Sequence, residues 1–232
     1  MRLLVILSAA ILSAACGASR AQVARVEQEG KLLRLELAET YVERGAHDAA
    51  IPLLRRAIAE QPENFHAHCL YAEVLRERGL FPQAERAFLM AIRLAPELAR
   101  AHAGLGVLYD LMRRPEEARK AHERSIALGP NQAPYWNNLG FSHLISGNVG
   151  KAIDSLEKAV ALDPALTIAL NNLGFAYGRR GDFEAALRCF RAAGGDRPAR
   201  LNLALVHEQR GDLESANRLR SQAEISSDTE GL

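Results

Sequence analysis

The chain has 232 residues, of which 48% are apolar and 25% are charged, and its formal net charge is +1. This composition excludes a disordered, highly charged tail. The charged residues form no basic block, which excludes the positive stripe that nucleic-acid binding needs, so no nucleic-acid partner is expected.

The first predicted element is an N-terminal targeting segment. Residues 3–15 carry no charge, are mostly apolar and follow Arg2. A stretch of this length is too short to cross a bilayer as a helix. The positive start, the apolar stretch and the small-residue end predict a secretory signal peptide over 1–15. The segment ends with LSAAC at Cys16, which resembles the lipobox of bacterial lipoproteins, although that family prefers leucine where Ser13 stands.

The lipobox resemblance implies that Cys16 is acylated and becomes the first residue of the mature chain. Gly17 then implies sorting to the outer membrane, on its periplasmic face. Removal of residues 1–15 takes one arginine from the 29 basic residues and leaves 28 acidic ones. The neutral mature chain is therefore expected to meet the membrane only through its lipid, with 16–30 as the lipidated tether. A soluble periplasmic protein, cleaved without acylation, and an uncleaved anchor are the alternatives.

An internal repeat organises the rest of the chain. The sequence WNNLGFSHLISGN, from Trp136, is nearly repeated as LNNLGFAYGRRGD, from Leu170, 34 residues later. The register extends in both directions, with four residues lost near Gly194. This period and its glycine, alanine and proline pattern are those of the tetratricopeptide repeat, a helix-turn-helix unit. The predicted units are 31–64, 65–98, 99–132, 133–166, 167–196 and 197–225, followed by a disordered tail over 226–232.

Places in the repeat are numbered from the first residue of each predicted unit, so that Lys31 and Ala133 stand at the first place. Certain places have a predicted packing role. A small residue at the eighth place and alanine at the twentieth let the two helices of a unit approach closely, while large residues at the fourth, seventh, eleventh and twenty-fourth places fill the space. Glycine at the fifteenth place adopts the left-handed conformation that ends the first helix. Because one unit cannot bury its apolar face alone, we expect an all-α, right-handed solenoid of about six units.

The sequence offers no candidate for catalysis or metal binding. Five of the seven histidines fall at packing places and should be structural, namely His68, His102, His122, His143 and His207. No histidine pair has the i, i+4 spacing of a zinc site, and no phosphate loop or nucleophile motif is present. Neither a metal nor another cofactor is predicted, and the protein is expected not to be an enzyme. The remaining cysteines, Cys69 and Cys189, lie in units three apart and are expected to be free thiols.

The concave face, lined by the first helix of each unit, is the predicted binding surface. Asparagine recurs there, and its side chain offers both a donor and an acceptor to an extended peptide backbone. The alternative is that these asparagines bond within the layer of helices. A clamp for a C-terminal carboxylate is rejected, because Leu35 and Glu39 stand at its places in the first unit. The candidate groove residues are Asn137, Asn138, Phe141, Asn171, Asn172, Phe175, Asn202 and Leu205.

A lipobox-like cysteine followed by six such units resembles the small tetratricopeptide lipoproteins of pilus assembly. These are the TadD group of the tight-adherence (Flp) pilus and the pilotin group, PilF, PilW and Tgl, of type IV pili. The segment from Asn171 to Asp212, with its shortened connection, is most similar to the tight-adherence members. The resemblance implies an outer-membrane scaffold that helps a secretin ring to assemble by binding secretin or another pilus component in its groove. The alternative is a general periplasmic adaptor for cell-envelope or outer-membrane protein assembly.

Overall fold

The computed structural model describes residues 20–229, and over this range it contains twelve α-helices and no strand. The all-α prediction is therefore confirmed. The predicted signal peptide and the predicted lipidation site, Cys16, lie outside the described residues. The chain divides into two compact units, which meet in sequence at Pro96 and Glu97.

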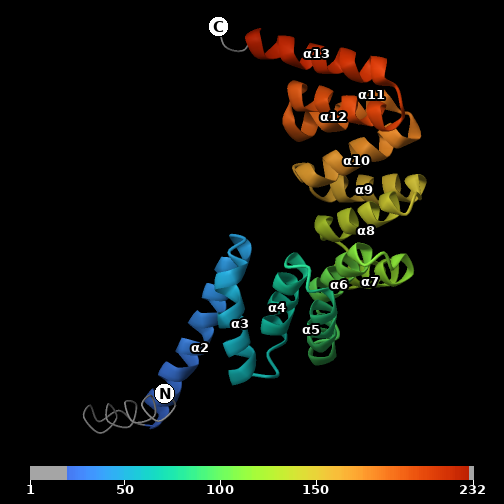
Figure 1. Ribbon diagram of the computed structural model, residues 1–232. Helices are drawn as coiled ribbons and strands as arrows, with labels where there is room; N and C mark the ends of the chain where they lie inside the picture. The colour runs from blue at the N-terminus through green and yellow to red at the C-terminus, as the bar shows by residue number, and fades with distance from the viewer. Residues whose placement is uncertain (1–19, 230–232) are drawn as a thin grey trace. The chain divides into compact units, whose positions relative to one another are not determined.

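Of the helices within residues 20–229, four lie in the N-terminal unit and eight in the C-terminal unit. Figure 1 labels them in chain order. In the N-terminal unit the helices are α2 (Arg20–Glu43), α3 (His47–Glu60), α4 (Phe65–Glu77) and α5 (Phe81–Leu94). In the C-terminal unit they are α6 (Ala99–Leu111), α7 (Pro115–Leu128), α8 (Ala133–Ile145), α9 (Val149–Leu162), α10 (Thr167–Arg180), α11 (Phe183–Gly194), α12 (Asp196–Gln209) and α13 (Leu213–Thr229).

Within each unit the helices form hairpins that stack on one another. In the C-terminal unit α6 packs on α7, α8 on α9, α10 on α11 and α12 on α13. Each second helix also contacts the first helix of the next hairpin, as α7 does with α8 and α9 with α10. First helices touch one another as well, since α8 contacts both α6 and α10. This is the solenoid-like packing of helix-turn-helix repeats.

The close approach inside each hairpin depends on glycine or alanine at the eighth place. A Cβ atom built on Gly174 would lie 2.5 Å from Cε1 of Phe190, and one on Gly140 would lie 2.5 Å from Cγ of Leu156. Both of these large side chains, at the twenty-fourth place, are completely buried. Alanine stands at the twentieth place in all six units and is completely buried in each: Ala50, Ala84, Ala118, Ala152, Ala186 and Ala216.

The turn between the two helices of a hairpin requires a left-handed residue at the fifteenth place. Five of the six units have glycine there, with φ between 69° and 96°: Gly45, Gly79, Gly147, Gly181 and Gly211. Glycine adopts this conformation without a steric cost. The third unit instead has Arg113, whose φ is 56°. Arg113 is the one residue other than glycine with positive φ between residues 20 and 229.

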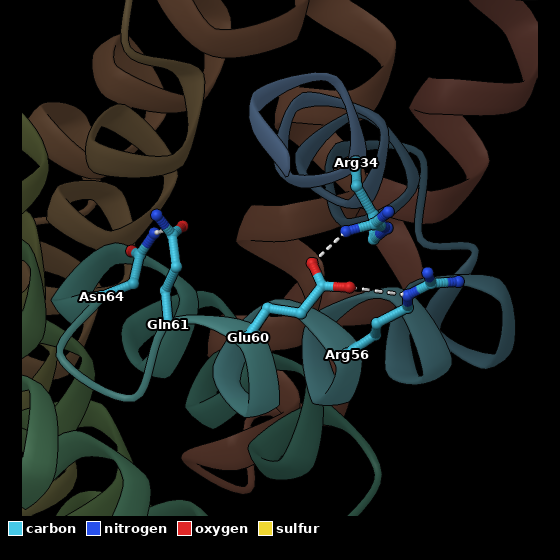
Figure 2. A network of polar contacts seen from close by, with 5 residues as sticks. All are labelled: Arg34, Arg56, Glu60, Gln61 and Asn64. Carbon is cyan, nitrogen blue, oxygen red and sulfur yellow. Dashed lines mark hydrogen bonds and ion pairs between the residues drawn. The ribbon is translucent and has the colours of Figure 1, made fainter. Parts of the chain in front are cut away.

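Polar contacts join the first two helices of the N-terminal unit. Glu60, at the end of α3, accepts hydrogen bonds from Arg34 of α2 and from Nε of Arg56, the latter at 2.9 Å (Figure 2). In the following turn, the side chain of Asn64 accepts a hydrogen bond from the backbone N–H of Ala67 at 3.0 Å and so caps α4. The ion pairs of Glu60 therefore fix the start of the connection from α3 to α4, and the Asn64 cap fixes its end.

The structure corrects the expectation at both ends of the repeat region. The helix α2 begins at Arg20, so most of the range 16–30 is helical, and its role as a lipidated tether stays a prediction. The stretch contains no proline, and an Arg25–Glu29 ion pair at i, i+4 supports the helix. At the other end α13 runs to Thr229, so 226–229 is helix rather than disordered tail, because neither glycine nor proline interrupts it before that residue.

Substitution of Gly174 by alanine tests the close packing of α10 against α11. The added methyl group would overlap the buried Phe190 ring, and we expect a loss of about 1–3 kcal/mol of unfolding free energy. Gly150 is the matched control, because it also lies in a helix but its Cβ would meet nothing within 4 Å. Gly150→Ala should leave stability equal or slightly higher. Thermal unfolding followed by circular dichroism separates the two variants, and equal melting temperatures would contradict this packing.

Candidate functional site

A groove of about 840 Å³ lies in the C-terminal unit, on the face formed by the first helices of three successive hairpins. The first helices α6, α8 and α10 and the turn after α6 provide its lining. The apolar lining residues are Val107, Leu111, Phe141, Ile145 and Ile168, and the polar ones include Asn137, Asn138, Asn172, Asp110, Arg113 and Arg114.

The apolar side chains of this groove are exposed. Leu111 is 53% exposed, Phe141 43%, Ile145 50% and Ile168 57%. Scattered exposed apolar residues need no explanation, but a contiguous patch inside a concavity is typical of a binding surface. The arrangement therefore provides an apolar surface that another protein segment can cover.

The asparagines bond to one another across neighbouring helices. Nδ2 of Asn172 donates to Oδ1 of Asn137 at 2.9 Å, and Nδ2 of Asn202 donates to Oδ1 of Asn171 at 3.2 Å. Each bond joins the sixth place of one unit to the fifth place of the unit before it. The pairs thus hold α8, α10 and α12 in register, as the alternative of bonding within the helix layer predicted.

Two asparagine groups still face the groove with spare capacity. Asn138 accepts a long hydrogen bond of 3.4 Å from Asn137, and its own amide N–H groups have no partner among the described residues. Asn172 uses an N–H group toward Asn137, which leaves its carbonyl oxygen available. An amide donor and a carbonyl acceptor on adjacent helices suit the backbone of an extended peptide.

The structure brings only half of the predicted groove residues together. Asn137, Asn138, Phe141 and Asn172 line the groove, whereas Asn171, Phe175, Asn202 and Leu205 lie beyond it on α10 and α12. Phe175 packs edge-on against Phe190, with ring centroids 5.0 Å apart, and is partly buried in the core. Leu205 is 40% exposed but lies outside the groove. Peptide binding by any of the eight residues stays a prediction.

Sequence reasoning missed a buried polar cluster behind the groove, formed by Asp110, His122 and Ser142. Nε2 of His122 lies 2.9 Å from one oxygen of Asp110, and Oγ of Ser142 donates to the other oxygen at 2.7 Å. The hydroxyl and the imidazole both contact the carboxylate and not each other. The imidazole therefore does not activate the hydroxyl, and the cluster is structural rather than a nucleophilic triad. Ser142 follows Asp110 by 32 residues, and repeat spacing alone does not reveal such a contact.

The two arginines of the groove, Arg113 and Arg114, differ in their side-chain interactions. Arg114 donates from Nε to Glu117 at 2.9 Å and lies 4.4 Å from the Tyr109 ring centroid. Its hydrogen bond lowers the pKa of the Glu117 carboxyl. The side chain of Arg113 is exposed and forms no ion pair or hydrogen bond within the described residues. Arg113 is thus the arginine of the groove whose guanidinium is free to bind a partner.

Residues 20–229 contain neither a candidate membrane span nor a candidate metal cluster. None of the helices there is both long enough and apolar enough to cross a bilayer. No three histidine, cysteine, aspartate or glutamate side chains of that range gather into a possible metal site. Cys69 is buried and Cys189 half-buried, both as free thiols, and burial raises the pKa of the Cys189 thiol.

Family profiles identify the repeat. Profiles described as tetratricopeptide repeat match residues 35–99, 74–133, 133–166 and 171–217, which is more than half of the chain. No curated protein sequence gives a significant match.

Solved structures of similar fold share little sequence with the chain. PilW, described as a widely conserved type IV pilus biogenesis factor, has a TM-score of 0.72 and 19% identity, over 84% of this chain and 92% of PilW. PilF of Pseudomonas aeruginosa has a TM-score of 0.69 and 19% identity, over 85% and 92% of the two chains. YrrB, a repeat protein with an unusual peptide-binding site, has a TM-score of 0.57 and 22% identity, over 73% and 90%. At these identities the likeness shows the fold alone.

Replacement of Arg113 by glycine should stabilise the protein. An arginine in the left-handed region carries a steric cost that glycine avoids, and its side chain forms no hydrogen bond or ion pair within residues 20–229 that would offset it. We expect a gain of about 1 kcal/mol, less a few tenths for the added flexibility of the unfolded chain. Chemical denaturation of Arg113→Gly against wild type measures the change. A loss of stability would mean that the side chain has a structural partner.

Loss of the Ser142 hydroxyl should destabilise the buried cluster. Ser142 is 3% exposed and is one of two donors to the Asp110 carboxylate, which would be left partly unsatisfied. We expect Ser142→Ala to cost about 1–3 kcal/mol. Ser221→Ala, at an exposed position of α13, is the control and should change stability by less than about 0.5 kcal/mol. Equal denaturation midpoints for the two variants would show that the hydrogen bond does not stabilise the fold.

Proposed function

The chain belongs to the tetratricopeptide-repeat family, and we propose that it is an outer-membrane lipoprotein that assists the assembly of a pilus or secretion machine. Proteins with these repeats are generally interaction scaffolds without enzymatic activity, and the proposal gives this chain the same role. It would hold a protein partner in the groove between α6, α8 and α10. The partner would be a secretin or another component of the machine, bound as an extended peptide or as a helix.

One observation carries the proposal for binding: four apolar side chains on three successive first helices are each more than 40% exposed inside one groove. A soluble monomer gains nothing from such a surface, whereas covering it by a partner removes apolar area from water at roughly 25 cal/mol per Å². The asparagine pairs add rigidity, since they hold the helices that carry these side chains. A rigid surface loses less conformational entropy on binding than a mobile one.

The choice of a pilus or secretion machine is supported by two kinds of likeness. The fold is similar to that of PilW, which is described as a type IV pilus biogenesis factor, over most of both chains. The sequence resemblance to tight-adherence and type IV pilus lipoproteins points the same way. The lipobox-like end of the signal segment at Cys16 supports attachment to the outer membrane through lipid, with the repeats in the periplasm. A soluble periplasmic form is the alternative location.

A general periplasmic adaptor is the second candidate function. It is favoured by the similarity to YrrB, which is described by its peptide-binding site and not by a pilus. Both functions use the same groove and differ only in the partner. The identity of the captured protein therefore separates them.

Pull-down from membranes tests the proposed function. We expect secretin to co-purify with the wild-type chain and to be lost in a Phe141→Ala, Ile145→Ala double variant, because the exposed apolar surface is removed while the core is untouched. Cys16→Ala should move the protein from the membrane fraction to the soluble fraction. Leu213→Ala, at an exposed apolar position of α13, is the matched control. Recovery of an envelope assembly protein without secretin would favour the adaptor function. Equal recovery of secretin by all variants would show that the groove is not the binding site.

A further inference from the structure

We propose that the groove binds an extended peptide segment in which an acidic side chain stands among apolar ones, with its carboxylate on Arg113. The inference rests on the proposed function, because it names the chemistry of the segment that the same groove would hold. Three features of the groove support the inference. They are its apolar floor, the guanidinium of Arg113 without a partner, and the unused amide groups of Asn138 and Asn172.

The apolar floor excludes a small anion as the occupant. Phe141 and Ile145 lie on α8, with Leu111 and Ile168 on the helices to either side. All four are substantially exposed, so the surface that a ligand must cover is larger than a phosphate or acetate ion and is mostly hydrocarbon. Apolar side chains of a polypeptide segment provide the matching surface.

The charged side chains that line the groove are Asp110, Arg113 and Arg114, so positive groups outnumber negative ones. Both oxygens of Asp110 are occupied, by His122 and by Ser142, and Arg114 is held by Glu117. Only Arg113 remains among the charged lining residues. A guanidinium beside an apolar surface forms a strong, directional pair with a carboxylate when a ligand excludes water around it.

The position of Arg113 in the repeat gives a second reason to assign it a ligand. The other five units place glycine at this turn, and arginine there adopts a left-handed conformation that costs about 1–2 kcal/mol. No hydrogen bond or ion pair of its side chain within the described residues offsets that cost. A side chain that is strained, exposed and directed to a groove is explained by an interaction that forms only in a complex.

The amide groups favour an extended segment over a helical one. A helix satisfies its own backbone groups internally, whereas an extended chain presents N–H and C=O groups that need partners. Asn138 offers a donor and Asn172 an acceptor to such a chain, from adjacent helices. The three features together describe an acidic-apolar extended segment of a partner protein.

Peptide binding to the full chain, purified in detergent, tests the inference by fluorescence anisotropy. The probes are fluorescein-labelled nonapeptides with amidated C-termini, in which aspartate or glutamate lies between leucine and phenylalanine residues. A second set has asparagine or glutamine in place of the acid, and a third set is neutral with a free C-terminal carboxylate. We expect the acidic set to bind wild type about tenfold more tightly than the neutral amidated set, a preference that falls as salt rises.

The Arg113 variants provide the decisive comparison. Arg113→Gly introduces the residue that the other five repeats have at this place, so the fold should be retained. Its affinity for acidic peptides should fall to that for neutral peptides. Arg113→Lys should keep most of the preference. Arg124→Ala, which removes an exposed charge from α7 away from the groove, is the matched control and should change nothing.

The outcomes separate this inference from the proposed function. Equal binding of acidic and neutral amidated peptides, a preference that survives in Arg113→Gly, or a preference for the free carboxylate alone would overturn the inference. In each of these cases binding that is lost in Phe141→Ala would still support the groove. Absence of binding by every set, or binding that Phe141→Ala leaves unchanged, would overturn both.

Discussion

The close approach of the two helices in each hairpin is the constraint on which the rest of the structure depends. A glycine or alanine at the eighth place lies against a fully buried side chain at the twenty-fourth place, such as Phe190 or Leu156. Alanine at the twentieth place, fully buried in all six units, keeps the same helices close. Because each hairpin is packed in this way, its second helix can contact the next hairpin and its first helix can line a common face. The groove exists because that face is left uncovered.

The third repeat departs from the pattern of its neighbours at two places, one buried behind the groove and one in its lining. His122 occupies the twenty-fourth place, where the preceding and following units have Phe88 and Leu156, and Arg113 occupies the turn glycine's place. Natural sequences tend to break local rules where function requires it. Here Nε2 of the histidine is paired with Asp110, although its buried Nδ1 has no partner, whereas the arginine side chain has no hydrogen bond or ion pair within the described residues. The uncompensated departure is the one that faces the groove.

Periodicity predicted the helices well because the 34-residue pattern reports directly on packing inside one unit. The glycine turns, the buried alanines and the free thiols follow from single places or simple spacing. Contacts between neighbouring repeats were harder to predict from the sequence. The bonds from Asn172 to Asn137 and from Asn202 to Asn171 join different places of adjacent repeats, so comparison of equal places does not reveal them. The helical start of α2 was also missed, because the repeat register begins at Lys31 whereas the helix extends back to Arg20.

The buried cluster and the charge of the groove are physically connected. Arg113 follows Asp110 by three residues, and a carboxylate oxygen without another partner could accept a hydrogen bond from a nearby guanidinium. Ser142 and His122 occupy both oxygens of Asp110 from the neighbouring helices α8 and α7. The carboxylate is thereby satisfied inside the protein, at 7% exposure of its side chain, and the arginine remains outside. A polar contact that stabilises the packing of three helices therefore also leaves a positive charge available to a partner.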